Sequence, residues 1–285
     1  MSLVASAEDN VQADYFLSHS LVPLANILMT EPSLLLVQCL LAVATLMQMY
    51  PPPQPVALFV SIALRIAQTL GLQQQQSDGT IEEKKTPQQT RVFWIAFYMD
   101  MSLCLLTQRL PGQRVVDIDV KVPEVKTKDK RGSISARVLV ADLLPLRVQL
   151  SLIQAAAYDG LSSVVARKTS IESRISTLGR VLADLEAFRR HHPIFSHSPR
   201  DLRNSLFQSD LVHLVRLEAA YFLTKYLLYT QASTRWTTIK PLEGSLRLEF
   251  AERIDEMLVH KCFPDAARLA TMISLVSRCG DALNW

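Results

Sequence analysis

The sequence predicts an all-α protein, and three observations lead to this fold class. Hydrophobic residues make up 49% of the 285 residues, which is ample for a sizeable core. Only 8 residues are glycine, whereas average usage would give about twenty, so a fold with many tight turns is disfavoured. Apolar residues recur at spacings of three and four along most of the chain, as in helices that bury one face. We therefore expect a single multi-helical domain over residues 1–285, with its helices packed in layers.

Two helices are predicted before residue 51. The first covers residues 11–29 and contains Pro23, which kinks or divides a helix. The second covers residues 33–50 and follows Pro32, a residue type that suits the first turn of a helix. The prolines of residues 51–55 end it, because no helix continues through consecutive prolines.

A third helix is predicted over residues 57–70. Its polar residues form one narrow stripe, so most of this helix should be buried. Gly71 follows at the position where a left-handed C-cap is expected. Residues 73–89 are polar and turn-prone, which predicts a mobile surface loop. A glutamine-rich activation segment is the functional alternative, but four glutamines in a row are few for that role.

The next helix is almost wholly apolar and carries one charge, Asp100. Its aromatic residues are spaced for a face that belongs to the core, and these residues are Phe93, Trp94, Phe97 and Tyr98. An ionised carboxylate left unpaired in such surroundings would cost several kcal/mol. Arg65 is the lone cation on the preceding apolar helix. We therefore predict a buried bridge between Arg65 and Asp100 that fixes how the two helices cross, a packing bond rather than an effector contact.

The segment after this helix is predicted to be extended over residues 115–122, because it alternates weakly and ends at Pro123. Residues 126–132 form a basic cluster. A solvated charge run explains the cluster without a partner, and an address signal or phosphate-binding role is the alternative.

The second half of the chain is predicted to be helical throughout. A helix over 134–157 has Pro145 as an internal kink, and a more polar helix covers 161–190. The latter has apolar residues at alternating spacings of four and three, a seam that suits packing within the domain or against a second copy. Further helices are expected over 202–229, 242–260 and 264–278.

The best candidate ligand pocket in the sequence lies on the helix over 202–229. Tyrosines with reachable hydroxyls and a few polar neighbours can line a small-molecule cavity, although the same stripe also suits core packing. The residues of this candidate are His213, Arg216, Tyr226 and Tyr229.

No motif marks out a catalytic, cofactor-binding or metal-binding residue, and no cofactor is expected. The four cysteines lie far apart, and His191, His192 and His197 have no acidic or cysteine ligand at helical spacing beside them. Nucleotide-binding loops and the nucleophile elbow of hydrolases are absent from the sequence. Carboxylates distant in sequence can still meet in space, so the sequence leans against an enzyme without deciding the question.

The composition also bounds the partners. A formal charge of +3 is too small for a nucleic-acid footprint without a clustered patch. The two most apolar runs fall short of the roughly twenty residues that a membrane span needs. We expect neither direct nucleic-acid binding nor membrane insertion.

The order of short motifs between residues 34 and 123 resembles the fungal-specific transcription factor domain, the middle homology region of fungal zinc-cluster regulators. The resemblance depends on six pieces in sequence: Ala67–Leu72, Arg91, Phe93-Trp94, Tyr98 with Asp100, Arg109–Pro111, and Asp117 with Asp119 and Pro123. Two positions depart from the pattern. Residues 88–91 replace the usual run of arginines, and Gln108 stands where the turn normally has glycine.

The resemblance implies an all-α regulatory domain that senses an effector or binds a protein partner or a second copy, in the nucleus or in nucleus and cytoplasm. In its relatives such a domain follows a DNA-binding cluster of six cysteines, which four cysteines cannot build. We therefore expect a fragment of a longer regulator or a stand-alone domain without its own DNA-binding module. The alternatives are an all-α metabolic enzyme or small-molecule-binding protein that reuses this scaffold, and a structural dimerisation module.

Overall fold

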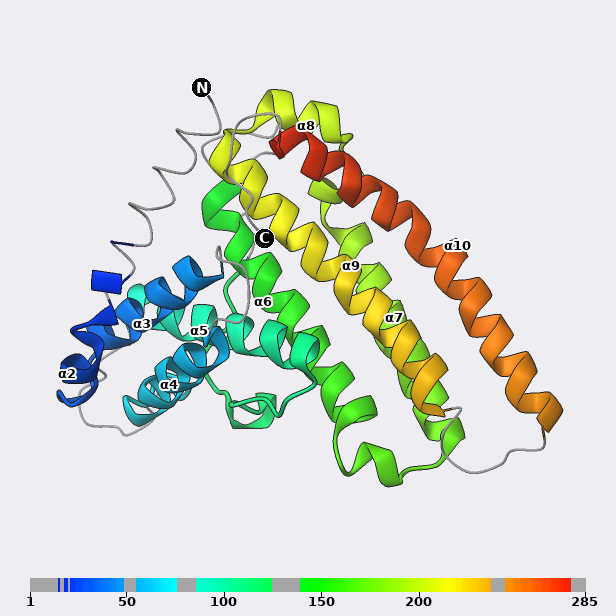
Figure 1. The fold of residues 1–285 in the computed structure, drawn as a ribbon, viewed down its shortest axis with the longest axis horizontal. Helices are drawn as coiled ribbons and strands as arrows, with labels where there is room; N and C mark the ends of the chain where they lie inside the picture. Colours follow the sequence, from blue (N-terminus) through cyan, green and yellow to red (C-terminus); the bar gives the residue numbers. More distant parts are fainter. Residues whose placement is uncertain are drawn as a thin grey trace. The chain divides into compact units, whose positions relative to one another are not determined.

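The computed structural model describes residues 15, 18–19, 21–48, 55–75, 86–124, 139–236 and 244–277 (Figure 1). Within these ranges the regular structure is helical and contains no strand, which confirms the all-α prediction. The described residues of Met1–Asp100 and Pro111–Lys121 form one compact unit, here unit 1, and those of Met101–Leu110 and Val122–Leu283 form unit 2. The single domain over residues 1–285 stays a prediction.

Unit 1 contains α2 (Leu24–Leu28), α3 (Leu34–Met47), α4 (Val56–Thr69) and the first part of α5 (Pro87–Thr107). Helix α3 begins at an N-cap, because the Ser33 hydroxyl accepts a hydrogen bond from the Leu36 N–H at 3.2 Å. Helices α3 and α4 pack against each other through residues that are fully buried, among them Val37, Leu40, Val60 and Ala63.

The C-terminal end of α4 confirms the expected glycine cap. Gly71 has φ +65°, the left-handed region that favours glycine. The Leu72 N–H donates to the Ala67 carbonyl at 2.9 Å, and the Gly71 N–H donates to Gln68 at 2.9 Å. This pair of bonds is a Schellman motif, which satisfies the last carbonyls of the helix. Leu72, the residue after the glycine cap, is buried.

The aromatic face of α5 belongs to the core, as the sequence predicts. Phe93, Trp94 and Phe97 are at most 1% exposed, and the Trp94 and Phe97 rings meet edge to face with centroids 5.5 Å apart. The Trp94 indole N–H donates to the Lys121 carbonyl at 2.9 Å. The polar end of this buried ring therefore has a partner, as burial requires.

The start of α5 corrects the predicted loop over residues 73–89. Helix α5 begins at Pro87, so residues 87–89 form its first turn. The Thr86 N–H donates to Gln89 Oε1 at 2.8 Å, and the Gln89 N–H lies 3.3 Å from the Thr86 hydroxyl. This reciprocal pair is a capping box, and Pro87 stands at a position where proline starts a helix well. Residues 76–85 of the predicted loop lie outside the described residues.

The extended segment expected over residues 115–122 is also corrected. Val115–Asp117 form a short 3-10 helix, η1, and no strand follows it within the described residues up to 124. The N–H groups of Asp119 and Val120 both donate to the Gln73 carbonyl, at 2.9 and 3.2 Å. Two donors on one acceptor fasten the segment at a single point, whereas a strand would need a ladder of pairs.

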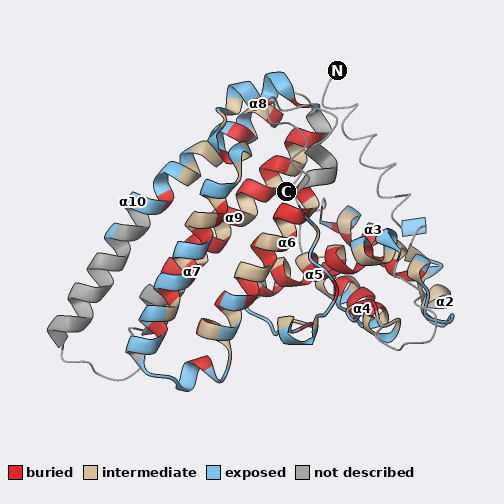
Figure 2. Cartoon of the chain, turned by 180° about the vertical axis from the view of Figure 1, so that it is seen from behind, coloured by how far each residue is buried: buried red, intermediate tan, exposed pale blue. Residues whose placement is uncertain are grey.

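Unit 2 contains the long helices α6 (Leu139–Ala157), α7 (Ile171–His191), α9 (Gln208–Trp236) and α10 (Gly244–Ser277), with the short helix α8 (Pro199–Ser205). Helix α9 contacts α6, α7, α8 and α10, and the four long helices lie side by side in both ribbon views (Figures 1 and 2). Figure 2 shows buried positions along α6, α7 and α9. Among the described residues, no helix combines the length and the apolar character that a bilayer span requires.

Several predicted boundaries in unit 2 are wrong. The helix expected over 161–190 begins at Ile171, where Ser170 caps it, and a π turn η2 (Tyr158–Ser162) and a 3-10 turn η3 (Ala166–Lys168) precede it. The helix expected over 202–229 is divided into α8 and α9.

The helices expected over 242–260 and 264–278 form one helix, α10, with Pro264 inside it. Proline removes the bond to the carbonyl four residues earlier, which here belongs to His260. Both His260 and Pro264 are exposed. Solvent can therefore satisfy that carbonyl, and the helix continues.

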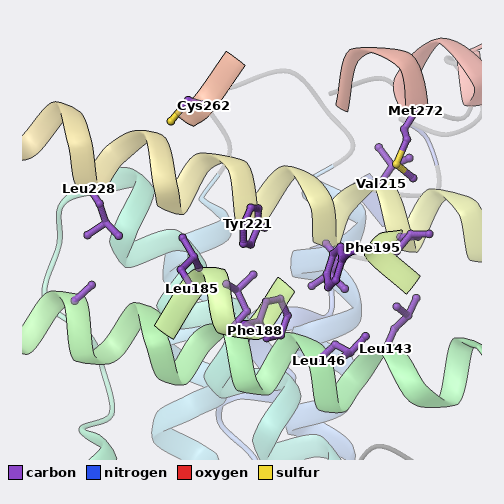
Figure 3. Packing of buried hydrophobic residues seen from close by; sticks show 14 of the residues in the cluster. Leu143, Leu146, Leu185, Phe188, Phe195, Val215, Tyr221, Leu228, Cys262 and Met272 are labelled. Carbon is purple, nitrogen blue, oxygen red and sulfur yellow. The ribbon is translucent and has the colours of Figure 1, made fainter. Parts of the chain in front are cut away.

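The core of unit 2 gathers around Tyr221 of α9 (Figure 3). Its ring stacks on Phe188 of α7 with centroids 6.4 Å apart, and Phe195 packs beside both rings. The seam predicted on α7 lies partly in this core, because Leu178 and Leu185 are buried in it whereas Ile175 is 39% exposed. For Leu178 and Leu185, packing is within unit 2.

Candidate functional site

The structure corrects the predicted Arg65–Asp100 bridge. Asp100 is buried, but Arg65 is exposed on α4, so the two do not form a buried ion pair. Instead the Asp100 carboxylate accepts a hydrogen bond from the Gly112 N–H at 2.8 Å. The Gln68 side chain of α4 donates to the Gly112 carbonyl at 2.9 Å. Residues of α4 and α5 therefore hold the same turn, and the Asp100 carboxylate binds the backbone of that turn.

The four residues of the predicted ligand pocket do not come together. His213 and Tyr226 both lie on the continuous helix α9, and thirteen residues of helix separate them by roughly 20 Å. Tyr229 is buried in the unit 2 core, whereas Tyr226 is 39% exposed and stacks on Phe222. Arg216 is half-buried. Tyr229 thus lies on the buried side of α9, and Tyr226 lies on a more exposed side.

A partly buried network of charges joins α7, α9 and α10. The Lys225 ammonium of α9 contacts Asp265 of α10 at 2.8 Å and Glu186 of α7 at 2.6 Å. Arg189 of α7 also pairs with Asp265. One turn further along α10, Arg268 Nε donates to Glu218 of α9 at 2.8 Å. Three cations and three carboxylates balance, which is the condition under which charges are tolerated inside a protein.

The protonation of this network follows from its surroundings. Burial by itself lowers the pKa of Lys225, but hydrogen bonds to Asp265 and Glu186 outweigh it and raise that pKa above its usual value. Burial raises the pKa of Tyr221, whose ring lies beside Arg189 and Lys225, to about 12. The network therefore keeps fixed charges at neutral pH, as suits a fastening between helices.

A cavity of about 80 Å³ lies within unit 2, at the π turn that follows α6. Met101, Leu105 and Leu110 supply its apolar lining. Its polar lining comes from the residue after α5 and from α6, the π turn and η3, through Gln108, Gln154, Tyr158, Ser162 and Arg167. Polar and apolar groups contribute about equally to the wall, and polar groups that converge on a cavity can orient a small molecule.

Gln154 is the residue of this cavity that most needs a partner. It is 2% exposed, and its Nε2 donates to the Thr224 hydroxyl of α9 at 2.9 Å. Its Oε1 is buried and has no hydrogen-bond partner in the structure. A buried acceptor without a donor costs about 1–3 kcal/mol, so Gln154 is a costly residue at this position of α6.

Two backbone features shape the cavity. Gln108, at its rim, has φ +58°, a conformation that glycine adopts without strain and other residues adopt rarely. Gly160 stands in the π turn, where a Cβ would approach Thr177 Cγ2 of α7 to 2.5 Å. The turn that carries Tyr158 and Ser162 therefore packs against α7 as closely as its backbone permits.

The sequence alone does not predict this cavity. Gln154 has a sequence signal, because it is the one polar residue in the run Leu152 to Ala157 of an apolar helix. The π turn has none, since its residues were expected to join two regular helices. Within the described residues, no group of three or more His, Cys, Asp or Glu side chains could hold a metal ion.

Comparisons with known proteins place the chain in a family. The model of the fungal specific transcription factor domain matches residues 3–176, which is more than half of the chain. The cavity lining, from Met101 to Arg167, falls wholly within these residues. No solved structure matches the chain.

The curated relatives are fungal transcription factors. The ABC-transporter-regulating transcription factors of Aspergillus oryzae and Aspergillus fumigatus are each 28% identical over 224 residues, which cover 78% of this chain and 25% of theirs. The Fusaridione A cluster transcription factor fsdR of Fusarium heterosporum is 29% identical over 220 residues, which cover 76% of this chain and 40% of that protein. The chain thus spans a quarter to two fifths of the length of these relatives. With a family match over most of its first 176 residues, this protein belongs to the fungal-specific transcription factor domain family.

Proposed function

We propose that this chain is the regulatory domain of a fungal transcription factor, that it works in the nucleus, and that it senses a small-molecule effector in the cavity of unit 2. The family match over residues 3–176 carries the transcriptional part of the proposal. The relatives whose alignments cover over three quarters of this chain are named as transcription factors.

The cavity supports effector sensing over a purely structural role. A dimerisation module needs a packed interior and an outer surface, and it has no need of a cavity lined by polar side chains such as Tyr158 and Arg167. A ligand in this cavity would contact α6, the π turn and η3 together and so favour one arrangement of these elements.

DNA binding is assigned to a separate module in this proposal, in keeping with the small net charge of +3. The output of the domain then passes through contacts with a protein partner or a second copy. A regulatory domain of this kind should change transcription at any promoter to which it is tethered.

The proposal is tested by tethering. Residues 1–285 are fused to an unrelated DNA-binding domain in a fungal host, and expression of a reporter with the matching sites is measured. We expect expression to rise or fall relative to the DNA-binding domain alone, and to respond when the host is moved between growth media. Expression equal to that of the DNA-binding domain alone, at equal protein level, would overturn the proposal.

A further inference from the structure

We propose that helix α3 of unit 1 binds the same helix of a second copy of this chain, with the two helices antiparallel. The inference goes beyond the proposed function and does not depend on the cavity of unit 2. Three observations carry it. The outer side of α3 is apolar, the helix has no charged residue, and its exposed residues form a pattern that is complementary to itself.

The outer side of α3 leaves large apolar side chains in solvent. Leu35 is 67% exposed and Leu46 is 47% exposed. Between them, Ala42 is exposed and Cys39 is half-buried. The four residues follow one another at spacings of four, three and four, so they form one narrow stripe along the helix, here called the α3 seam. The same spacing aligns the contact residues of coiled coils.

Helix α3 lacks the polar side that surface helices usually turn to solvent. Its sequence from Leu34 to Met47 contains no charged residue, and its polar residues Gln38 and Thr45 are half-buried. The outer side of α4, by contrast, includes the exposed residues Arg65 and Thr69. A helix that is apolar on all sides is normally buried on all sides. The α3 seam therefore has the composition of a contact surface.

The α3 seam has the order large, small, small, large in either direction along the helix. If a twofold axis passes between Cys39 and Ala42, Leu35 lies opposite Leu46 of the second copy, and Cys39 lies opposite Ala42 of the second copy. Each contact then occurs twice, as in every interface that one surface makes with itself. The small residues at the centre allow the two helix axes to approach closely, and the leucines pack at both ends.

The absence of charge favours a second copy over a different protein. Different proteins select each other largely through complementary charges, which the α3 seam does not offer. Two copies of an uncharged surface bring no like charges together. A helix of 14 residues is about 21 Å long, so one pair of helices buries less than the roughly 1,200 Å² of a standard interface. We therefore expect a reversible dimer with a dissociation constant in the micromolar range.

Analytical ultracentrifugation of the purified chain of residues 1–285, over a series of concentrations and with a reductant present, measures the dimer. We expect Leu46→Glu to raise the dissociation constant by about tenfold or more, because the carboxylate enters the apolar contact twice. The matched control is Leu106→Glu, since Leu106 is 51% exposed and lies on α5, outside the seam. It should leave the dissociation constant unchanged. Circular dichroism checks that both variants are folded, as substitutions of exposed residues permit.

A second substitution tests the antiparallel arrangement. In the Leu35→Lys/Leu46→Glu variant, each new lysine faces a new glutamate of the other copy, so the double variant should dimerise more tightly than Leu46→Glu alone. Within one chain the two positions lie about 16 Å apart along the helix, so they cannot pair with each other. In a parallel dimer, like charges would meet at both positions. A double variant that dimerises no better than Leu46→Glu would contradict the antiparallel pairing.

Disulfide formation gives a readout that does not depend on affinity. Ala42→Cys places a thiol opposite Cys39 of the second copy, so mild oxidation should link two chains covalently. Adding Cys39→Ser to this variant should abolish the link. A link that forms equally well in the absence of Cys39 would contradict the proposed register of the two helices.

The inference is overturned if the chain is monomeric at every concentration, or if Leu46→Glu and Leu106→Glu change the dimer equally. In a monomeric chain, labelling of the Cys39 thiol identifies the alternative. Protection of the thiol would assign the seam to another segment of this chain, and reaction would leave it to a different protein.

The outcome is separate from that of the tethering experiment. A monomeric chain that changes expression of the tethered reporter would refute the dimer alone. A chain that dimerises through the α3 seam but leaves the reporter unchanged would refute the regulatory function alone.

Discussion

Asp100 shows at the scale of one residue how a buried charge can fasten a turn. Its carboxylate and the Gln68 side chain hold the N–H and the carbonyl of Gly112 from two different helices. A Cβ at Gly112 would lie 3.0 Å from Leu64 Cδ2, so the turn lies close against α4. The geometry makes Asp100 a structural residue of unit 1.

Asp100→Asn should lower the free energy of unfolding by about 1–2 kcal/mol, because the amide oxygen still accepts from Gly112 but the charge is lost. Arg65→Gln is the matched test of the rejected bridge. Since Arg65 is exposed, we expect a change within about 0.5 kcal/mol. Urea denaturation measures the free energy of unfolding of both variants, and equal losses for the two would favour the predicted Arg65–Asp100 ion pair.

His192 and His213 give unit 2 a dependence on pH. Burial is the main cause that lowers the pKa of both below the ordinary 6.5, with the neighbouring charges of Arg147 and Arg216 adding to the effect at His213. The unfolded chain therefore takes up protons at a higher pH than the folded chain does. Stability is complete above pH about 6.5 and falls as the pH drops through and below that value.

We expect the free energy of unfolding to be lower at pH about 5.5 than at about 7.5, and the difference to shrink when His192 and His213 are both replaced by Gln. Denaturant titrations at the two pH values measure this difference in the free energy of unfolding. An unchanged difference in the double variant would assign the effect to other groups.

At the scale of elements, the contact between the π turn and α7 positions the cavity. Gly160→Ala would place a methyl group 2.5 Å from Thr177 Cγ2, so the turn or the helix must shift. Overpacking of this kind costs about 1–3 kcal/mol.

Thr177→Ser removes the clashing methyl and keeps the hydroxyl, so the Gly160→Ala/Thr177→Ser double variant should recover most of the lost stability. Thermal unfolding of the four proteins in this cycle measures the coupling. Additive effects of the two substitutions would show that the contact does not position the turn.

The charge network joins α10 to α7 and α9. Lys225→Met leaves Asp265 with Arg189 but removes the cation that also contacts Glu186. Breaking a buried pair by removing one partner costs about 3–5 kcal/mol, and the remaining arginine places the expected loss near the lower end. Lys261→Met, on an exposed position of α10, should change stability by less than about 0.5 kcal/mol. Equal losses for the two lysines, measured by denaturation, would contradict the role of the network.

At the scale of the whole molecule, periodicity in the sequence was enough for the all-α fold, the buried face of α5 and the left-handed cap at Gly71. These features depend on neighbours within a few residues. Helix continuity was harder to predict, because Pro264 is tolerated only where the carbonyl it leaves unpaired meets solvent. That exposure is a property of the fold.

The candidate site could be predicted only in part. The cavity brings α5 residues together with Gln154 and Arg167, and the charge network joins Lys225 to Asp265, pairs that no helical spacing relates. The predicted pocket is wrong because two of its residues, His213 and Tyr226, lie far apart on one helix. Each residue of a helix adds to the distance along its axis, so residues many positions apart cannot line the same small pocket.

If the cavity senses a ligand for transcriptional control, a substitution in its lining should change how a tethered reporter responds to the growth medium. Reporter expression is compared for tethered chains carrying no substitution, Gln154→Met or Gln149→Met, at equal protein levels in the same host. Gln154 is a lining residue of the cavity, whereas Gln149 contacts His192 outside it. We predict that Gln154→Met alone abolishes the response of the reporter to growth medium. A response retained in full by a folded Gln154→Met chain would contradict the claim.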